Sequence, residues 1–228
     1  RDDVESRGLG DVYKRQLWGY VADGLYIDEA DIANNPTSTL GNITIAAGDV
    51  KYVDQPDVNG NYDGQIDSDD RVAIGHPTIP EIIYGFGPSI TWKKWDFSVF
   101  FQGQANVSLM MSGFEPFGTQ SKNNVLEWIA EDYWSKENQN PNAKYPRLTK
   151  YNNNNNMQSS TYWLRNAAFL KLKNAEVGYN FKWGRVYMSG TNLLTFSPFK
   201  LWDPEMGGGK GMAYPTQRTF NLGVQITF

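Results

Sequence analysis

Apolar side chains recur at every second position in several segments, and this alternation limits most strongly how the chain can fold. The clearest case is the last segment, where Phe220, Leu222, Val224, Ile226 and Phe228 alternate with polar residues or glycine. A β-strand turns successive side chains to opposite faces, so such a segment has one apolar and one polar face. Similar patterns predict strands over residues 17–27, 82–92, 96–104, 169–181 and 185–196. We therefore expect an all-β fold of about six antiparallel strands.

Tight turns and long connections alternate between these predicted strands. The turns at residues 92–95 and 181–184 are tight, whereas the other connections span residues 28–81, 105–168 and 197–218. In an up-and-down antiparallel sheet, all tight turns then lie at one edge and all long loops at the other. Transmembrane β-barrels of the outer membrane have this arrangement, with short periplasmic turns and long extracellular loops.

The edge with the tight turns should also carry an aromatic girdle, which flanks the lipid-facing band of such barrels. Its members would be Trp92, Trp95, Phe181, Trp183 and Phe228. A soluble β-sandwich is the alternative, because its strands also alternate and its tryptophans lie in the core. Compact soluble domains usually connect their elements with about 4–6 residues. The long connections therefore favour the barrel.

The composition agrees with strands, not helices, as membrane-spanning elements. Mean hydropathy is -0.55, and no apolar run reaches the roughly 18 residues of a transmembrane helix. Barrel strands need only about 9–11 residues of alternating polarity. The chain has no cysteine, which excludes disulfides and thiol catalysis. Its net charge is -4 and it has no basic cluster, so no nucleic-acid partner is expected.

The first residues differ in character from the remainder of the chain. Residues 6–16 resemble a translated sequencing adapter joined to a transposon end. We expect residues 1–16 to be an artefact of this kind and exclude them from fold reasoning. Residues 17–228 are then the part to be interpreted.

Many stretches of residues 17–228 are similar, in the same order, to the SusC/RagA family of TonB-linked (TonB-dependent) outer-membrane transporters. The stretches are Gly19–Leu25, Tyr84–Phe86, Trp95–Gly103, Tyr145–Leu148, Trp163–Asn174, Asn192–Phe196, Asp203–Glu205 and Tyr214–Phe220. The resemblance implies that residues 17–228 are the C-terminal part of a large plugged barrel in the bacterial outer membrane. Six strands alone would leave unpaired backbone groups in lipid, at several kcal/mol each, so the sheet is expected to be incomplete on its own.

The resemblance also implies a function and partners. The expected function is import of glycan- or peptide-derived nutrients, with a SusD-like surface lipoprotein and with a TonB complex that contacts a missing N-terminal region. Outer-membrane lipid and the barrel-assembly machinery are further expected partners, and Phe228 would be the signal that this machinery reads. The alternatives are a soluble carbohydrate-binding β-sandwich and a surface protein that does not transport.

The acidic segment 57–70 matches the spacing of an EF-hand calcium loop. Asn59, Asn61 and Asp63 fall at its first, third and fifth positions, and Gly64 falls at its turn. The remaining oxygens would come from the Gln65 backbone carbonyl, from Asp67 at position nine and from Asp70 at position twelve. Asn at the start and Asp at the end depart from the usual pattern. Structural calcium and a metal-free solvated turn both stay open.

Other polar and aromatic residues give weaker expectations. Trp163, Arg165 and Trp202 are candidates for contacts with a ligand or a lid. The carboxylate pairs Glu131–Asp132 and Asp203/Glu205 give no sign of the raised pKa that a glycosidase acid requires, so no enzymatic role is expected. A short amphipathic helix is predicted over residues 121–134, and the asparagine run 152–156 is predicted to be a mobile loop tip.

Overall fold

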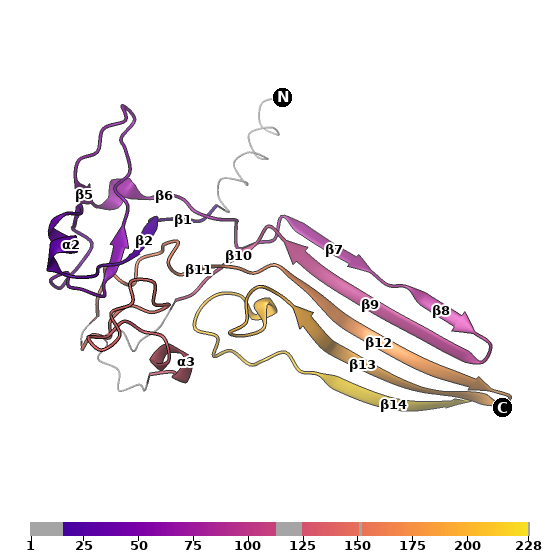
Figure 1. The fold of residues 1–228 in the computed structure, drawn as a ribbon. Coiled ribbons are helices and arrows are strands. Elements are labelled where there is room, and N and C mark those ends of the chain that lie inside the picture. The colour runs from indigo at the N-terminus through magenta and orange to yellow at the C-terminus, as the bar shows by residue number, and fades with distance from the viewer. Residues whose placement is uncertain (1–15, 113–124, 151, 228) are drawn as a thin grey trace, which may run out of the picture. The chain divides into compact units, whose positions relative to one another are not determined.

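The computed structural model describes residues 16–112, 125–150 and 152–227, and Figure 1 shows their course. The chain divides into two compact units. The first unit contains residues 1–75 and 111–164, and the second contains residues 76–110 and 165–228. The expectations for residues 1–16 and for Phe228 lie outside the described residues, Gln16 excepted. No helix in the described part of the chain is long and apolar enough to cross a membrane.

The second unit is built on an antiparallel sheet of six strands, two of which follow one another along the same neighbouring strand (Figure 1). The order across the sheet is β14 (Thr219–Ile226), β13 (Gly184–Phe196), β12 (Phe169–Phe181), β9 (Trp95–Ala105) and β7 (Ile82–Phe86), with β8 (Ser89–Trp92) also paired to β9. The expected all-β class and five of the predicted segments are thereby confirmed. The segment 82–92 forms two strands, because Gly87 and Pro88 interrupt it and proline has no N–H for the ladder.

Both predicted tight turns are present, and they lie at one end of the sheet. Trp92 pairs with Trp95, and Phe181 pairs with Gly184, so each turn has two residues between its strands. Lys93 has a φ of 57°, the left-handed conformation that such hairpin turns require. The aromatic side chains at this end are exposed: the exposed fraction is 61% for Trp92 and 65% for Trp183. The predicted grouping of aromatics at the tight-turn end is confirmed for the described residues.

The register of the strands gives the sheet one apolar and one polar face. Phe97 pairs with Val177, Val177 with Met188, and Met188 with Leu222, so these four form one apolar row. The same face carries Phe86, Ile90, Trp95, Leu172, Val186, Leu194, Phe220 and Val224. The opposite face carries Asp96, Ser98, Gln102, Lys171, Asn174, Glu176, Asn180, Arg185, Ser189, Thr191, Asn221 and Gln225. Alternation along each strand is thus continued across the whole sheet.

The first unit contains short elements around a small core. Its strands are β1 (Trp18–Gly19), β2 (Ala22–Leu25), β3 (Thr37–Ser38), β4 (Val50–Tyr52), β5 (Gln65–Ile66) and β6 (Val72–Ala73). They pair as β1 with β6, β2 with β4, and β3 in parallel with β5. The helices are α2 (Glu29–Ala33), the 3-10 turn η1 (Ser68–Asp70) and α3 (Glu127–Ala130). The core consists of Tyr20, Leu25, Val50, Tyr52, Ile66, Trp134 and Ala143.

Two expectations for the first unit change with the structure. The predicted strand over residues 17–27 does not join the large sheet, because its halves β1 and β2 pair with β6 and β4 instead. Of the helix predicted over residues 121–134, the described part is only α3, and residues 113–124 lie outside the described chain. The strands β10 (Ser108–Met110) and β11 (Leu164–Asn166) complete the list of elements, together with the 3-10 turn η3 (Pro204–Met206).

Candidate functional site

The loop over residues 197–218, here called the β13–β14 loop, is fixed to the polar face of the sheet by ion pairs. Lys171 projects from that face of β12, and none of its surface is exposed. Its Nζ donates to Asp203 Oδ2 at 2.6 Å and to Glu205 Oε2 at 2.5 Å. Lys173 Nζ lies 2.6 Å from the second Glu205 oxygen. The β13–β14 loop is therefore anchored to β12 through Lys171 and Lys173.

The carboxylates of this anchor are held in their charged form. Burial tends to raise the pKa of Asp203, but hydrogen bonds from Lys171 and Thr216 outweigh it and lower that pKa below its ordinary value. Burial also tends to raise the pKa of Glu205, but hydrogen bonds from Lys171 and Lys173 outweigh it and lower that pKa below its ordinary value. A glycosidase needs one carboxyl with a raised pKa as its acid. Asp203 and Glu205 therefore act as an anchor and not as an acid–base pair.

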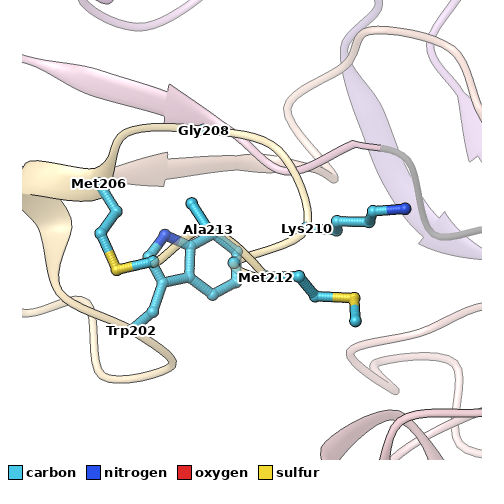
Figure 2. Close-up of a pocket in the computed structure, with 7 residues that line it drawn as sticks. Trp202, Met206, Gly208, Lys210, Met212 and Ala213 are labelled. Atoms are coloured by element: carbon cyan, nitrogen blue, oxygen red, sulfur yellow. The ribbon is translucent and has the colours of Figure 1, made fainter. Parts of the chain in front are cut away.

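Next to this anchor, the β13–β14 loop encloses a pocket of about 290 Å³ (Figure 2). Its lining residues are Trp202, Met206, Gly208, Lys210, Gly211, Met212 and Ala213. The Trp202 indole occupies the middle of the close-up, with the Met206 sulfur beside it. Its Nε1 donates to the Gly207 carbonyl at 2.9 Å, and Phe199 packs edge-on against its ring. A β-carbon on Gly211 would lie 2.4 Å from that ring, so only glycine fits there.

The three predicted ligand or lid residues are not brought together as one site. Trp202 lines the pocket just described, which is compatible with the prediction, and ligand contact by Trp202 stays a prediction. Trp163 belongs to the first unit, whereas Arg165, in β11, belongs to the second. Trp163 is 4% exposed and its Nε1 donates to the Asn156 carbonyl at 2.7 Å. These are contacts of a core side chain, and they give no support to a ligand role for Trp163.

The asparagine run shows a second, unpredicted polar cluster, in the first unit. Asp49 is fully buried, and Arg147 donates two hydrogen bonds to its carboxylate, at 2.7 and 2.9 Å. Asn153 and Asn156, also fully buried, donate to Asp49 Oδ1 at 2.8 and 2.9 Å. The predicted mobile tip over residues 152–156 is therefore wrong for these residues. Their amides are needed to satisfy a buried carboxylate.

Asn155 extends this cluster to strand β4 of the first unit. Its side chain donates to the Val50 carbonyl at 2.8 Å and accepts from the Ser38 hydroxyl at 2.6 Å. Its carbonyl accepts from the Tyr52 hydroxyl at 2.6 Å. Burial raises the pKa of Tyr52 well above its ordinary value, so this hydroxyl stays a donor. The cluster fixes the backbone of β4 and does not form an accessible site.

The acidic loop over residues 57–70 is ordered by its own carboxylates. Asp57 Oδ1 accepts the backbone N–H groups of Asn59 and Asn61 at 2.7 and 2.9 Å. These bonds are the largest causes of a lowered pKa for Asp57. Asp63 Oδ1 accepts from the Gln65 N–H at 2.8 Å. These bonds fix the turns of the loop within its own sequence.

The end of the acidic loop differs from the predicted calcium geometry. Asp70 is 4% exposed, and its two oxygens accept the backbone N–H groups of Asp67 and Gln55 at 2.7 and 2.6 Å. Asp67 in turn caps η1 through a bond from the Asp69 N–H. Across the described residues, no group of three or more His, Cys, Asp or Glu could hold a metal. Asp70 is thus a capping residue here, and calcium stays a prediction for this loop.

An ion cluster lies on the polar face near the tight-turn end of the sheet. Arg185 of β13 donates to Asp96 of β9 and, at 2.5 Å, to Glu176 of β12, and Asn180 donates to Asp96 at 2.7 Å. Gly178 lies between them, and a β-carbon there would clash with the Arg185 guanidinium. This cluster was not predicted from the sequence, and its members come from three different strands.

Comparisons with known proteins agree with this architecture. No family model matches the chain. A TonB-dependent receptor, P26 of Formosa agariphila, is 31% identical over 210 residues, which are 79% of this chain and 20% of that protein. TonB-dependent receptor P3 of the same organism is 26% identical and covers 98% of this chain and 22% of its own length. TonB-dependent receptor SusC of Bacteroides thetaiotaomicron is 24% identical over 99% of this chain and 21% of its own length.

Solved structures show the same fold. The RagAB peptide transporter matches with a TM-score of 0.68 at 21% identity, over 93% of this chain and 22% of that one. RagAB in the closed-closed state matches with a TM-score of 0.65 at 23% identity, over 93% of this chain and 23% of that one. The chain spans about a fifth of the length of the curated relatives it matches. These matches and the two-faced sheet together show that the chain belongs to the SusC/RagA family of TonB-dependent receptors.

Proposed function

We propose that this chain is part of an outer-membrane transporter that imports glycan- or peptide-derived nutrients. The observation that carries the proposal is the six-stranded sheet, whose register separates an apolar face from a polar one. In a transporter of this kind the apolar face contacts lipid and the polar face lines the interior. The proposed role is transport and not catalysis, which fits the lowered pKa values of Asp203 and Glu205.

The proposed partners follow from the relatives. The SusC relative is a TonB-dependent receptor, and the RagAB structures are of a peptide importer. By extension, energy for import would come from a TonB complex, which would engage parts of the transporter that this chain does not span. A SusD-like surface lipoprotein would bind on the outer side, where the long loops lie. The barrel-assembly machinery would insert the sheet, with Phe228 as its signal.

A soluble β-sandwich is disfavoured by the exposure of the apolar face. A sandwich buries that face against a second sheet. In the described part of this chain, 78% of Leu222, 65% of Phe220 and 63% of Val224 are exposed. Side chains of this size in one continuous patch need an apolar environment. Lipid supplies one, and so the membrane placement is preferred.

Two neighbouring residues of β14 allow a direct test of the two faces. Asn221 pairs with Ser189 on the polar face, and Leu222 pairs with Met188 on the apolar face. The chain has no cysteine, so single cysteines can be placed at either position in the full-length transporter, with any cysteine elsewhere replaced. In outer membranes, Asn221→Cys should react with a water-soluble maleimide, and Leu222→Cys should react only after detergent extraction. Equal labelling of both positions in membranes would refute the lipid-facing assignment.

Transport itself is tested in cells. A strain that lacks the full-length gene should lose growth on either oligopeptides or oligosaccharides as the limiting nutrient, and the complemented strain should regain it. Inactivation of the TonB complex should give the same loss. Growth of the deletion strain on both nutrient classes at the parental rate would contradict the proposed function. The nutrient class that supports the difference identifies the substrate class.

A further inference from the structure

The apolar face of the sheet contains a hollow of about 260 Å³ that crosses β9, β12, β13 and β14. Its floor follows a cross-strand row in which Val99 pairs with Ala175, Ala175 with Gly190, and Gly190 with Phe220. The two central positions of the row are therefore small. The neighbouring row on the same face carries Met188, which borders the hollow. The sheet thus has a depression where the surrounding rows have large side chains.

A β-bulge forms one wall of this hollow. The pairing of β12 with β13 shifts between Leu172 and Asn174, and Asn192 opposite has a φ of 54°. Bulges of this kind re-aim a side chain out of the regular alternation. Leu193 is brought over Gly190, because a β-carbon on Gly190 would lie 2.6 Å from a Leu193 methyl group. The depression is therefore shaped by an irregularity in the strands as well as by small residues.

The chemistry of the lining is almost purely hydrocarbon. The side chains that face the hollow are aliphatic, aromatic or thioether groups. Ser98, Glu176 and Ser189 also border it, but they belong to the polar-face row, so only their backbone contributes. A sugar or a peptide backbone placed here would lose hydrogen bonds to water without replacement, at a cost in free energy. A hydrocarbon chain loses none and gains close packing contacts.

We propose that this hollow binds one acyl chain of an outer-membrane lipid. The inference rests on the proposed placement of the sheet in the membrane. The hollow is continuous with the exposed apolar surface that includes Phe220 and Leu222, and lipid chains are the hydrocarbon that such a surface meets. Binding between apolar groups in a membrane depends on packing and not on exclusion of water, so a fitted depression is what can retain one chain over others.

The test uses the full-length transporter, purified in a mild detergent and analysed by native mass spectrometry. The unmodified protein should keep one phospholipid or lipid A molecule through detergent washes. Ala175→Phe fills the hollow and should lower the lipid-bound fraction about tenfold, which corresponds to about 1.4 kcal/mol. Val186→Phe enlarges a side chain on the same face outside the hollow and should retain the lipid. Ala175→Leu is a smaller filling that serves if the phenylalanine variant does not assemble.

Three results would overturn the proposal: no lipid retained by the unmodified protein, equal retention by the Ala175 and Val186 variants, or a second transporter copy or a protein partner found in place of lipid. Nutrient uptake measured in the same strains keeps this proposal separate from the proposed function. Loss of lipid by the Ala175 variants with unchanged uptake supports the hollow as a lipid site. Retained lipid with no uptake by the unmodified protein would instead refute the proposed function alone.

Discussion

Lys171 Nζ lies 2.6 Å from Asp203 Oδ2, although the two residues are 32 positions apart and belong to a sheet strand and a loop. The lysine is fully buried, whereas 17% of the Asp203 side chain is exposed. A buried ammonium is stable only when it is paired and hydrogen-bonded. The position of the β13–β14 loop is therefore coupled to the charge on its two carboxylates.

Replacing Lys171 should release this loop. Lys171→Met keeps the length of the side chain but leaves Asp203 and Glu205 without their shared donor. The expected loss is about 1–3 kcal/mol of local stability, because the carboxylates keep partial contact with water. Hydrogen–deuterium exchange of the full-length transporter should then rise over residues 197–218. Lys200→Met, at an exposed lysine of the same loop, is the matched control, and equal exchange in the two variants would argue against the anchor.

The same anchor should weaken in acid. The folded-state pKa values of Asp203 and Glu205 lie below their ordinary values of 3.8 and 4.5. Such groups stabilise the folded loop fully above the ordinary values, and this contribution is lost as pH falls through the lowered ones. Exchange over residues 197–218, corrected for its intrinsic pH dependence, should be constant from neutral pH down to about pH 5 and increase in more acidic solution. In Lys171→Met the acid-dependent increase should be smaller, because the bonds from Lys171 are lost while those from Thr216 and Lys173 remain, and an undiminished increase would point to other groups.

The buried cluster of the first unit should be sensitive to loss of one charge. Asp49→Asn leaves Arg147 without a partner charge and disturbs the amides of Asn153 and Asn156. Breaking a buried pair in this way costs about 3–5 kcal/mol. Amide exchange in residues 44–54 of the full-length protein should rise sharply. Asp23→Asn removes an acid whose side chain is 69% exposed, and it should change little. A comparable effect of both substitutions would contradict the structural role of Asp49.

Calcium binding by the acidic loop is a proposal that calorimetry can decide. Titration of the full-length transporter with calcium should show one site, because the loop offers several carboxylate and amide oxygens, which are the ligands that this ion takes. Asp63→Asn keeps the hydrogen bond to the Gln65 N–H but removes a charge and should weaken binding. Asp69→Asn changes a residue outside the predicted ligand set and should bind as before. Absence of calcium-dependent heat in the unmodified protein would refute the site.

The large sheet could be predicted from the sequence because neighbouring residues determine its strands and its turns. Period-two alternation fixes which side chains share a face, and each tight turn fixes the register of its two strands. Residues 17–27 alternate too, but their partners β4 and β6 are short segments that no pattern distinguishes from a loop. Periodicity alone could therefore not show that residues 17–27 pair with these segments and not with the large sheet.

The polar clusters could not be predicted, because each depends on residues far apart in the sequence. Arg147 and Asp49 are separated by 98 positions, and no spacing rule connects them. The asparagine run has the composition of a solvated loop, yet Asn153 and Asn156 supply the donors that a buried carboxylate needs. The burial of Lys171 likewise depends on Asp203 and Glu205, which lie more than 30 positions away in the β13–β14 loop.

An arginine on the apolar face of β14 should block assembly of the transporter. Phe220 pairs with Gly190 on that face, two apolar rows further from the tight turns than the row of Trp95, and it is 65% exposed, so Phe220→Arg would place a charge against hydrocarbon. The expected cost is about 2–4 kcal/mol near the middle of the membrane. Asn221→Arg on the opposite face of the same strand should cost much less, because that face is polar. The folded fraction in outer membranes is measured by the heat-dependent shift in gel mobility. If both variants assemble equally well, the two faces do not differ in their contact with lipid, and the apolar face requires another partner.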